Sequence, residues 1–320
     1  MIPELPHVPA LVILLLRNCA IDCIRLSKVF SFTKLNYLYL CKYKDKLIKE
    51  FKKGDLEIVL ATMNRVSLDF LVPMFPFDHF SNFSILIVNQ TDKNKLLVSD
   101  YPSIRVINSF EKGLSKSRNI GLQNAKGKII LIADDDEIFK KYFENTILEA
   151  HNIYPEAASI CFAIEDFNGS LFKKYPSKTK LQLNLLDIFN IVSIEISLKK
   201  AIFDQLNIKF DTNFGLGSSF TMGEEAIFLS DWKKRKQSII IVPKVIASHS
   251  MISTDDKLNV EQRYYVQGAF FTRVSRSSYL KGVFLKLFFD IKQQKITIRD
   301  VFAAVKSANR GKIDFVKMKK

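Results

Sequence analysis

Three consecutive carboxylates, Asp134, Asp135 and Asp136, directly follow a short apolar run, Ile129 to Ala133. A run of this length and β-branched content is typical of a buried strand. Carboxylates at the tip of such a strand repel one another unless a cation lies between them, and ligands of open α/β sheets bind just beyond the carboxyl ends of the strands. The pattern predicts a divalent metal site at the strand tip; the alternative is a solvated acidic turn that caps the next helix.

The segment before this strand, Gly113 to Ala125, supplies positive charge. It carries apolar residues at helical spacing among Ser, Lys, Arg and Asn, and Gly127 follows as a typical helix-ending residue. The start of a basic helix is suited to binding an anion such as a phosphate. We therefore expect a helix here, with its basic end beside the carboxylates.

The composition and net charge indicate which kinds of partner to expect. The chain of 320 residues has a net charge of +15, which favours an anionic partner: nucleic acid, a membrane surface or a phosphorylated substrate. Zinc-finger spacing, a helix-turn-helix signature and an RNA-recognition motif are all missing from the sequence, so we do not expect nucleic acid binding. The four cysteines form no CxxC pair and are expected to be reduced, as in a cytoplasmic protein.

The N-terminal part, residues 1–54, is predicted to be a helical extension. Apolar residues recur at helical spacing between Leu11 and Phe32, so the extension is expected either to pack on the main domain or to touch a membrane. The apolar stretch Val8 to Leu16 is too short to span a bilayer, and the only charge before it is Glu4. Since a signal peptide begins with a positive region, we do not expect one here.

Residues 55–255 are predicted to form an α/β domain, because strand-like and helix-like segments alternate along them. Connections of the βαβ type join such strands most economically, which favours a three-layer, mainly parallel sheet. Strands are expected at Leu56–Ala61, Phe83–Val88, Ile104–Ile107 and Ala158–Ile164, and helices at Ser67–Phe75, Phe139–Tyr154 and Ser197–Leu206. A Gly- and Ser-rich loop, Asp211 to Phe220, is expected to approach a ligand.

The C-terminal part, residues 256–320, is predicted to be helical and basic. Helices are expected at Asn259–Val274, Tyr279–Gln294 and Thr297–Ala308. In the second, apolar residues at positions 280, 284, 287 and 291 recur at helical spacing among lysines, as in helices that lie in a membrane interface. The alternative is a helix packed on the core; the net positive charge favours the membrane surface.

The order of the motifs resembles the inverting family 2 glycosyltransferases of GT-A fold, including those that build bacterial surface polysaccharides. The resemblance covers about residues 56 to 250. The motifs that carry it are Thr62-Met63-Asn64-Arg65, Asn89-Gln90-Thr91-Asp92, Gly113-Leu114-Ser115-Lys116-Ser117-Arg118-Asn119, Asp134-Asp135-Asp136, Gly223-Glu224-Glu225 and the late His249. It implies a GT-A type three-layer sheet and a transferase of hexosyl or related sugars.

The resemblance also implies a role for each motif. Asp136 is the expected ligand of Mg²⁺ or Mn²⁺, with Asp134 against the ribose or the metal. His249 is expected to complete the metal site or to contact the diphosphate. Asp135 is the variable middle position. These assignments agree with the chemistry, since a divalent cation stabilises a diphosphate leaving group and prefers oxygen ligands.

Inversion at the sugar requires a base that takes the proton of the attacking hydroxyl. The family pattern places that base at Glu225, with Glu224 as the second candidate; the alternative is an ordinary acidic first turn, which is favourable to a helix. Asn89 stands where the family usually has Asp. The residues expected to bind the donor are Thr62, Asn64, Arg65, Asn89, Arg118 and Asp134.

The resemblance implies a nucleotide-sugar donor and a glycan or lipid-linked acceptor. The protein is expected in the cytoplasm, peripheral to the inner face of the cell membrane. Two other readings stay open: a nucleotidyltransferase-like metal enzyme and a non-catalytic GT-A-like binding subunit. A nucleotidyltransferase would be expected to have a Gly-rich phosphate-binding loop after the first strand. This chain has Thr62 to Arg65 there.

Overall fold

The computed structural model describes residues 50–250 and 258–318. The chain divides into two compact units, Met1–Glu50 and Phe51–Lys320. The predicted N-terminal extension lies outside the described residues up to position 49. Within the described residues, no helix combines the length and apolar character needed to cross a bilayer.

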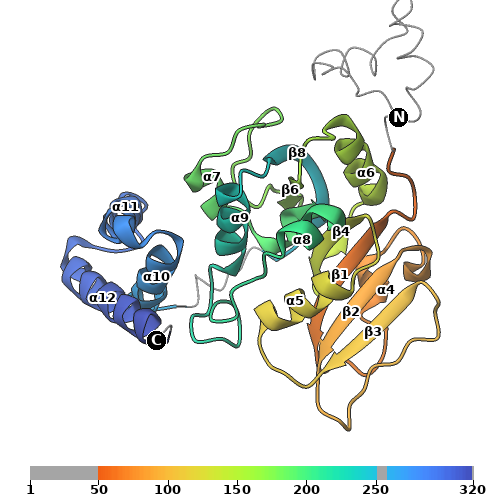
Figure 1. Ribbon diagram of the computed structural model, residues 1–320, viewed down its shortest axis with the longest axis horizontal. Coiled ribbons are helices and arrows are strands. Elements are labelled where there is room, and N and C mark those ends of the chain that lie inside the picture. Colours follow the sequence, from red (N-terminus) through yellow and green to blue (C-terminus); the bar gives the residue numbers. More distant parts are fainter. Residues whose placement is uncertain (1–49, 251–257, 319–320) are drawn as a thin grey trace, which may run out of the picture. The chain divides into compact units, whose positions relative to one another are not determined.

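An eight-stranded mixed sheet forms the centre of the second unit (Figure 1). Its strands are β1 (Leu56–Met63), β2 (Ile85–Gln90), β3 (Ile104–Ser109), β4 (Ile129–Asp134), β5 (Ile138–Phe139), β6 (Ser159–Glu165), β7 (Ile196–Lys199) and β8 (Ile239–Ser248). Their spatial order is β3-β2-β1-β4-β7-β6-β8-β5. The neighbours from β3 to β4 are parallel, as is β6 with β8, whereas β7 runs antiparallel to both β4 and β6.

Helices cover both faces of this sheet. They are α4 (Leu71–Met74), α5 (Leu114–Asn124), α6 (Phe143–Ile153), α7 (Leu185–Phe189), α8 (Lys200–Leu206) and α9 (Glu224–Lys234). Because side chains alternate along a strand, Ile58 and Leu60 of β1 join the core with α6 while Val59 joins the core with α5 and α9. The predicted three-layer α/β fold is confirmed.

Parallel pairing brings the site-bearing ends of the strands together. Ala61 of β1 lies opposite Asp134 of β4, and Met63 lies opposite Gln90 of β2. Helix α5 packs directly on β1, since a Cβ at Gly121 would lie only 2.3 Å from Val59 Cγ1. Arg118 precedes that glycine by three residues and therefore shares its sheet-facing side.

Three segments differ from the sequence-based expectation. Residues 196–199 form β7 and only then does α8 begin, whereas we expected one helix over Ser197–Leu206. The start of the expected helix Phe139–Tyr154 is instead strand β5, which pairs with β8. The expected helix Ser67–Phe75 is reduced to the short α4, which Pro73 and Pro76 keep from extending.

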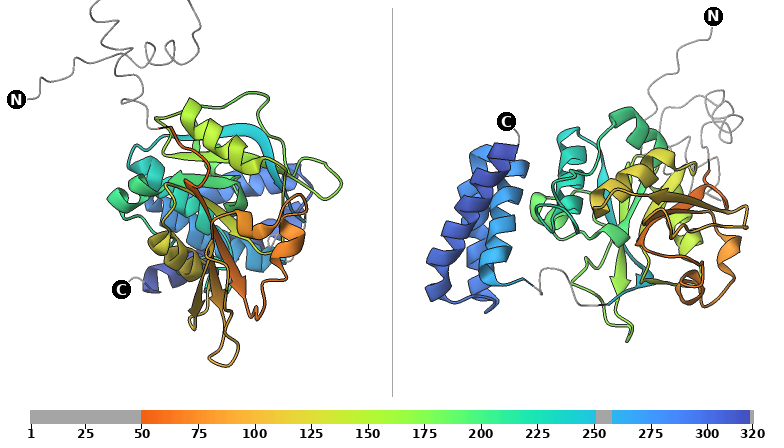
Figure 2. Two further views of the ribbon diagram at one scale, coloured as in Figure 1. Left: turned by 90° about the vertical axis from the view of Figure 1, so that its right-hand side faces the viewer. Right: turned by 90° about the horizontal axis from the view of Figure 1, so that it is seen from below.

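The C-terminal part forms three helices, α10 (Val260–Val274), α11 (Tyr279–Lys292) and α12 (Val301–Met318), coloured blue in Figure 2. Helices α10 and α12 cross closely, because a Cβ at Gly268 would lie 1.9 Å from the carbonyl oxygen of Ala308. Phe315 of α12 packs in one core with Phe214 and Phe220, so the helices and the loop of the sheet domain share a core. Helix α12 continues well beyond the expected end at Ala308.

Candidate active site

The three consecutive aspartates point to three different partners. Asp134 Oδ1 lies 3.1 Å from Arg118 Nη2, and Asp136 Oδ1 lies 3.1 Å from His249 Nε2. Asp135 accepts hydrogen bonds from Arg65 Nε, at 2.9 Å, and from the Thr62 hydroxyl. Donors from α5, from the end of β1 and from the end of β8 therefore offset the repulsion among the carboxylates.

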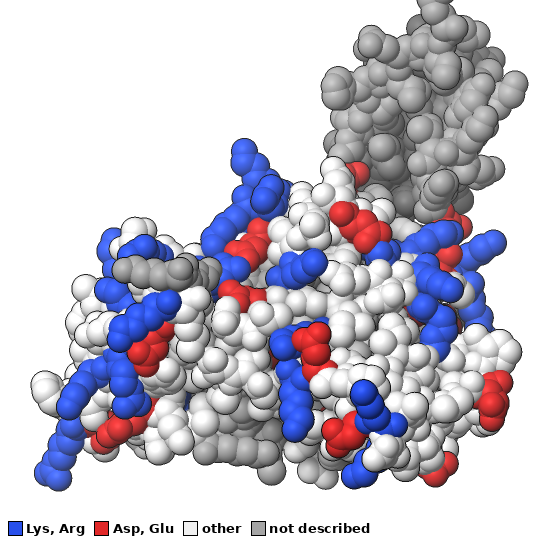
Figure 3. Space-filling view, turned by 60° about the horizontal axis from the view of Figure 1, so that its bottom comes forward, with Lys and Arg blue, Asp and Glu red and all other residues white. Residues whose placement is uncertain are grey.

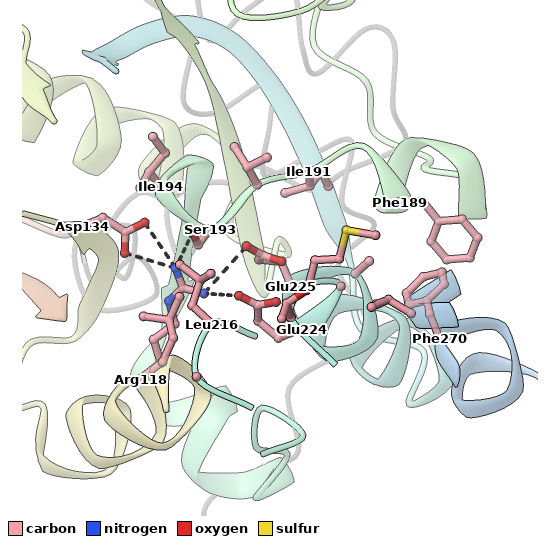
Figure 4. A pocket seen from close by; sticks show the side chains of 18 of the residues that line it. Arg118, Asp134, Phe189, Ile191, Ser193, Ile194, Leu216, Glu224, Glu225 and Phe270 are labelled. Carbon is pink, nitrogen blue, oxygen red and sulfur yellow. Dashed lines mark hydrogen bonds and ion pairs between the residues drawn. The ribbon is translucent and has the colours of Figure 1, made fainter. Parts of the chain in front are cut away.

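Arg118 connects this strand tip to the acidic start of α9, as Figure 4 shows. It is 1% exposed, and its Nη1 lies 3.0 Å from Glu224 Oε1 and 3.7 Å from Glu225 Oε1. Its Nη2 also donates to Ser193 Oγ at 2.6 Å. Burial disfavours the charge, but the carboxylates outweigh burial and raise the pKa of Arg118. The structure places Arg118 against protein carboxylates and the Ser193 hydroxyl.

The two glutamates at the start of α9 have different environments. Glu224 is buried, its Oε2 has no hydrogen-bond partner among the described residues, and burial raises the pKa of its carboxyl. The Glu225 side chain is 19% exposed and lines the pocket. Gly223 turns the chain into the helix with φ +97°, where a Cβ would also lie 2.9 Å from the Phe270 ring. Both glutamates line the pocket, but the Glu224 side chain is only 5% exposed, so Glu225 is the more accessible of the two.

Asp136 and His249 both line the pocket and are hydrogen-bonded to each other. Their hydrogen bond lowers the pKa of Asp136 and raises the pKa of His249. Within residues 50–250 and 258–318, no three His, Cys, Asp or Glu residues are grouped to hold a metal alone. Mg²⁺ is commonly bound by one or two carboxylates with phosphate oxygens and water. The pair therefore fits a divalent cation that a diphosphate would help to coordinate, while Asp134 is held by Arg118.

Glu137 is a site residue that sequence reasoning passed over. It is 1% exposed, its Oε1 accepts a hydrogen bond from the Asp134 amide at 3.1 Å, and burial raises the pKa of its carboxyl well above the usual range. Its contact fixes the backbone of the turn that carries the three aspartates. In the sequence, Glu137 could have been noticed as a fourth consecutive acidic residue, directly before an apolar pair.

Asn89 faces inward. It is 0% exposed, its Oδ1 accepts from the Arg65 amide at 3.1 Å, and its Nδ2 donates to the Arg65 carbonyl at 2.9 Å and to Asn108 Oδ1 at 3.0 Å. Through these hydrogen bonds, Asn89 holds the loop after β1 in place. Thr62 and Asn64 remain on the pocket wall, and Asn64 takes the left-handed conformation with φ +56°.

A pocket with a volume of about 1460 Å³ is lined by the three aspartates, Arg118, His249, the two glutamates, Thr62 and Asn64. One half is bounded by the ends of β1, β2 and β4, with Thr62, Gln90 and Asp134. The other half is bounded by α7, α10 and α11. Glu225 lines the same pocket, and Leu216 and Gly217 of the Gly- and Ser-rich loop also reach it, as expected of that loop.

Comparisons with known proteins agree with this geometry. Residues 77–227 match the family model described as Glycosyl transferase family 2. An uncharacterized glycosyltransferase of Haemophilus influenzae is 30% identical over 88 residues, which are 26% of this chain and 30% of that protein. The matched part thus spans less than a third of that relative's length.

Two solved structures of TarS from S. aureus, both of residues 1–349, share the fold. One is 15% identical, with 80% of each chain covered and a TM-score of 0.51. The other, in complex with UDP-GlcNAc, is 14% identical, with 79% of each chain covered and a TM-score of 0.53. Residues 77–227 thus match glycosyltransferase family 2, and the sheet with its helices has the GT-A fold.

Proposed function

We propose that the protein is an inverting glycosyltransferase, assisted by a divalent cation, that moves a sugar from a nucleotide sugar to an acceptor hydroxyl. The position of Glu225 is the observation that carries this proposal. Its carboxylate lines the pocket at the start of α9, while Arg118 holds it in one cluster with Asp134 at the tip of β4. A sugar lying between the two would have a base on the face opposite its leaving group, as direct displacement requires.

The donor side is served by the ends of β1 and β4. Thr62 and Asn64 offer polar groups to the nucleotide, and Asp134, fixed by Arg118, offers carboxylate oxygens to the ribose. Asp136 and His249 would hold Mg²⁺ or Mn²⁺, which would neutralise the charge that develops on the leaving diphosphate. Both terminal nitrogens of Arg118 bind protein groups, so Arg118 acts as a positioning residue for carboxylates on both sides.

Glu225 is favoured over Glu224 as the base. In the proposed step the acceptor oxygen forms a bond to the anomeric carbon as the bond to the diphosphate breaks, and the hydroxyl proton passes to Glu225. Glu224 is buried and its Oε1 lies 3.0 Å from Arg118 Nη1, so it is less accessible to an acceptor hydroxyl than Glu225.

The reaction and the cation are tested together by transfer and donor-hydrolysis assays with a panel of nucleotide sugars and Mn²⁺. We expect Asp136→Ala to lose transfer, while Glu156→Gln, a change to an exposed carboxylate, keeps it. Full transfer by Asp136→Ala would show the metal assignment to be wrong. Release of diphosphate from nucleoside triphosphates would favour a nucleotidyltransferase. Binding of the nucleotide sugar without turnover would favour a non-catalytic binding subunit.

We also propose that the acceptor is a lipid-linked glycan, used in surface polysaccharide synthesis at the cytoplasmic face of the membrane. Support comes from α11, although its exposed row differs from the expected one. Leu287 is buried, whereas Leu280, Phe284 and Phe288 are 57%, 57% and 61% exposed.

On the face drawn in Figure 3, basic side chains are dispersed among acidic ones. They do not form the continuous basic patch that is typical of nucleic-acid-binding proteins.

Membrane binding is best tested by point changes. Removing residues 278–320 would also remove Phe315, which packs against Phe214 and Phe220. We expect the double variant Phe284→Ser, Phe288→Ser to bind anionic vesicles more weakly, because it removes apolar surface from the interface. Val98→Ser, at an exposed loop position, is the matched control. Equal sedimentation of all three proteins with vesicles would contradict the proposal.

A further inference from the structure

Glu195 is a buried carboxylate that the proposed reaction does not use. It is 1% exposed, does not line the pocket, and stands at the end of the 3₁₀ turn η2 (Ser193–Glu195), directly before β7. Burial raises the pKa of the Glu195 carboxyl, whereas hydrogen bonds from Lys173 and Tyr175 oppose that rise. Because a buried carboxylate is costly unless donors surround it, its partners indicate what it contributes.

Three donors from two segments of the chain converge on Glu195. Lys173 Nζ lies 2.7 Å from its Oε2, the Tyr175 hydroxyl donates to its Oε1, and the Val192 amide donates to its Oε2 at 3.2 Å. Lys173 and Tyr175 belong to residues 166–184, between β6 and α7. Lys173 Nζ also donates to the carbonyl oxygen of Asn190, the residue after α7. One carboxylate thus joins the segment after β6 to the segment that carries η2.

The segment after β6 brings Phe172 to the pocket beside His249. The Phe172 amide donates to the Ile164 carbonyl at 3.0 Å, and the Ile164 amide donates to the Tyr175 hydroxyl at 3.2 Å. Phe172 and His249 both line the pocket, and their rings meet edge to face with centroids 6.4 Å apart. Loss of the bonds from Lys173 or Tyr175 to the buried carboxylate would therefore loosen the wall against which His249 packs.

The turn η2 brings Ser193 to Arg118. Arg118 Nη2 donates to Ser193 Oγ at 2.6 Å, and Figure 4 shows this bond next to the bonds from Arg118 to the carboxylates. Because Glu195 accepts a hydrogen bond from the Val192 amide, its carboxylate closes the turn around Ser193. A change at Glu195 would therefore reach the guanidinium that holds the carboxylates of the site in place.

We propose that Glu195 is a positioning residue of the transferase site. Its bonds to Lys173 and Tyr175 hold the wall beside His249, and its bond to η2 holds the hydroxyl that binds Arg118. The inference rests on the proposed function, because His249 and Arg118 serve a reaction only if the pocket is a transferase site. It adds a residue outside the pocket that joins the end of the site with His249 to the end with the glutamates of α9.

Hydrogen exchange of the full chain tests the positioning without depending on activity. Lys173→Met and Tyr175→Phe keep most of the side-chain volume but remove a donor to Glu195. In both variants the amides of Phe172 and Val192 should exchange about tenfold faster, which is the effect of losing one hydrogen bond to a charged group.

The matched control is Lys180→Met. Lys180 lies in the same segment after β6 and forms an ion pair of the same 2.7 Å length, but with Asp187 and not with Glu195. The control should leave both amides at the wild-type exchange rate. If either amide exchanged at the wild-type rate in both Glu195-partner variants, or as fast in the control as in those variants, the inference would be overturned.

A double-mutant cycle with His249→Ala separates positioning from a general loss of stability. Lys173→Met should raise the Mn²⁺ concentration for half-maximal transfer by at least about threefold in the wild-type background and leave it unchanged in the His249→Ala background, because residues that act through one another are not additive. Equal effects in both backgrounds, or none in either, would overturn the inference. Absence of transfer by the wild type would instead refute the proposed function, and hydrogen exchange would still decide the role of Glu195.

Discussion

Replacing Arg118 by methionine should test how the site is held together. Methionine keeps much of the side-chain volume but removes the cation that lies within hydrogen-bond distance of Asp134, Glu224 and Ser193. Removing one partner of a buried ion pair costs about 3–5 kcal/mol, because the remaining charge is left without compensation. Glu224 can take up a proton and avoid this, so we expect the lower end, about 3 kcal/mol at neutral pH.

The stability deficit of the Arg118→Met variant should depend on pH in a defined direction. Burial already raises the pKa of Glu224 in the wild type, and loss of the guanidinium must raise it further. A carboxyl group with a raised pKa in the folded state contributes stability below its unfolded pKa and loses it as the pH rises. The deficit of the Arg118→Met variant should therefore be larger at pH 8 than at pH 5.

Urea unfolding at the two pH values measures the deficit directly. A loss of about 3 kcal/mol is a large share of the 5–15 kcal/mol typical of folded proteins and corresponds to a fall of roughly 10 °C in melting temperature. Arg235→Met, at an exposed position at the end of α9, is the control and should change little. A deficit below about 1 kcal/mol, or one that shrinks as the pH rises, would refute the reasoning.

Other contacts of the structure make further predictions. Glu224→Gln should be more stable relative to the wild type as the pH rises above 4.5, since the variant has no buried carboxyl to ionise; parallel stability curves would contradict this. Gly268→Ala should lower the free energy of unfolding by about 1–3 kcal/mol, because the new Cβ would lie 1.9 Å from the Ala308 carbonyl oxygen, whereas the exposed Ser277→Ala should not. A chelator should reduce transfer by at least about a hundredfold, with recovery on adding Mn²⁺, and His249→Ala should require more Mn²⁺ for the same rate. An unchanged rate in the chelator would contradict the cation's role.

The positions of the strand ends could be predicted from the sequence. The apolar runs before Thr62, Asn89 and Asp134 are long and β-branched enough to identify buried strands, and parallel pairing then brings their ends together. Strand β7 could not be predicted, because Ile196 to Lys199 runs without a break into α8 and its pairing with β4 and β6 is long-range. The family resemblance, confirmed by the comparisons, indicated the order of motifs but not the contacts among them.

The partners of the side chains were the least predictable part. Whether Arg118 faces a diphosphate or Glu224 depends on packing between α5 and α9, which are far apart in the sequence. The inward position of Asn89 depends on Asn108 of β3. On α11 the apolar period predicted a helix, but both Leu287 and Phe284 fit that period, and only packing against α10 and α12 decides which of them is buried.

Transfer and donor binding by Glu225→Gln test the central claim most directly. The amide keeps the size of the side chain but is a far weaker base than the carboxylate. We predict that transfer falls by at least about a hundredfold while the nucleotide sugar binds with nearly the wild-type dissociation constant. Transfer at the wild-type rate, or loss of donor binding together with transfer, would contradict the assignment of Glu225 as the base.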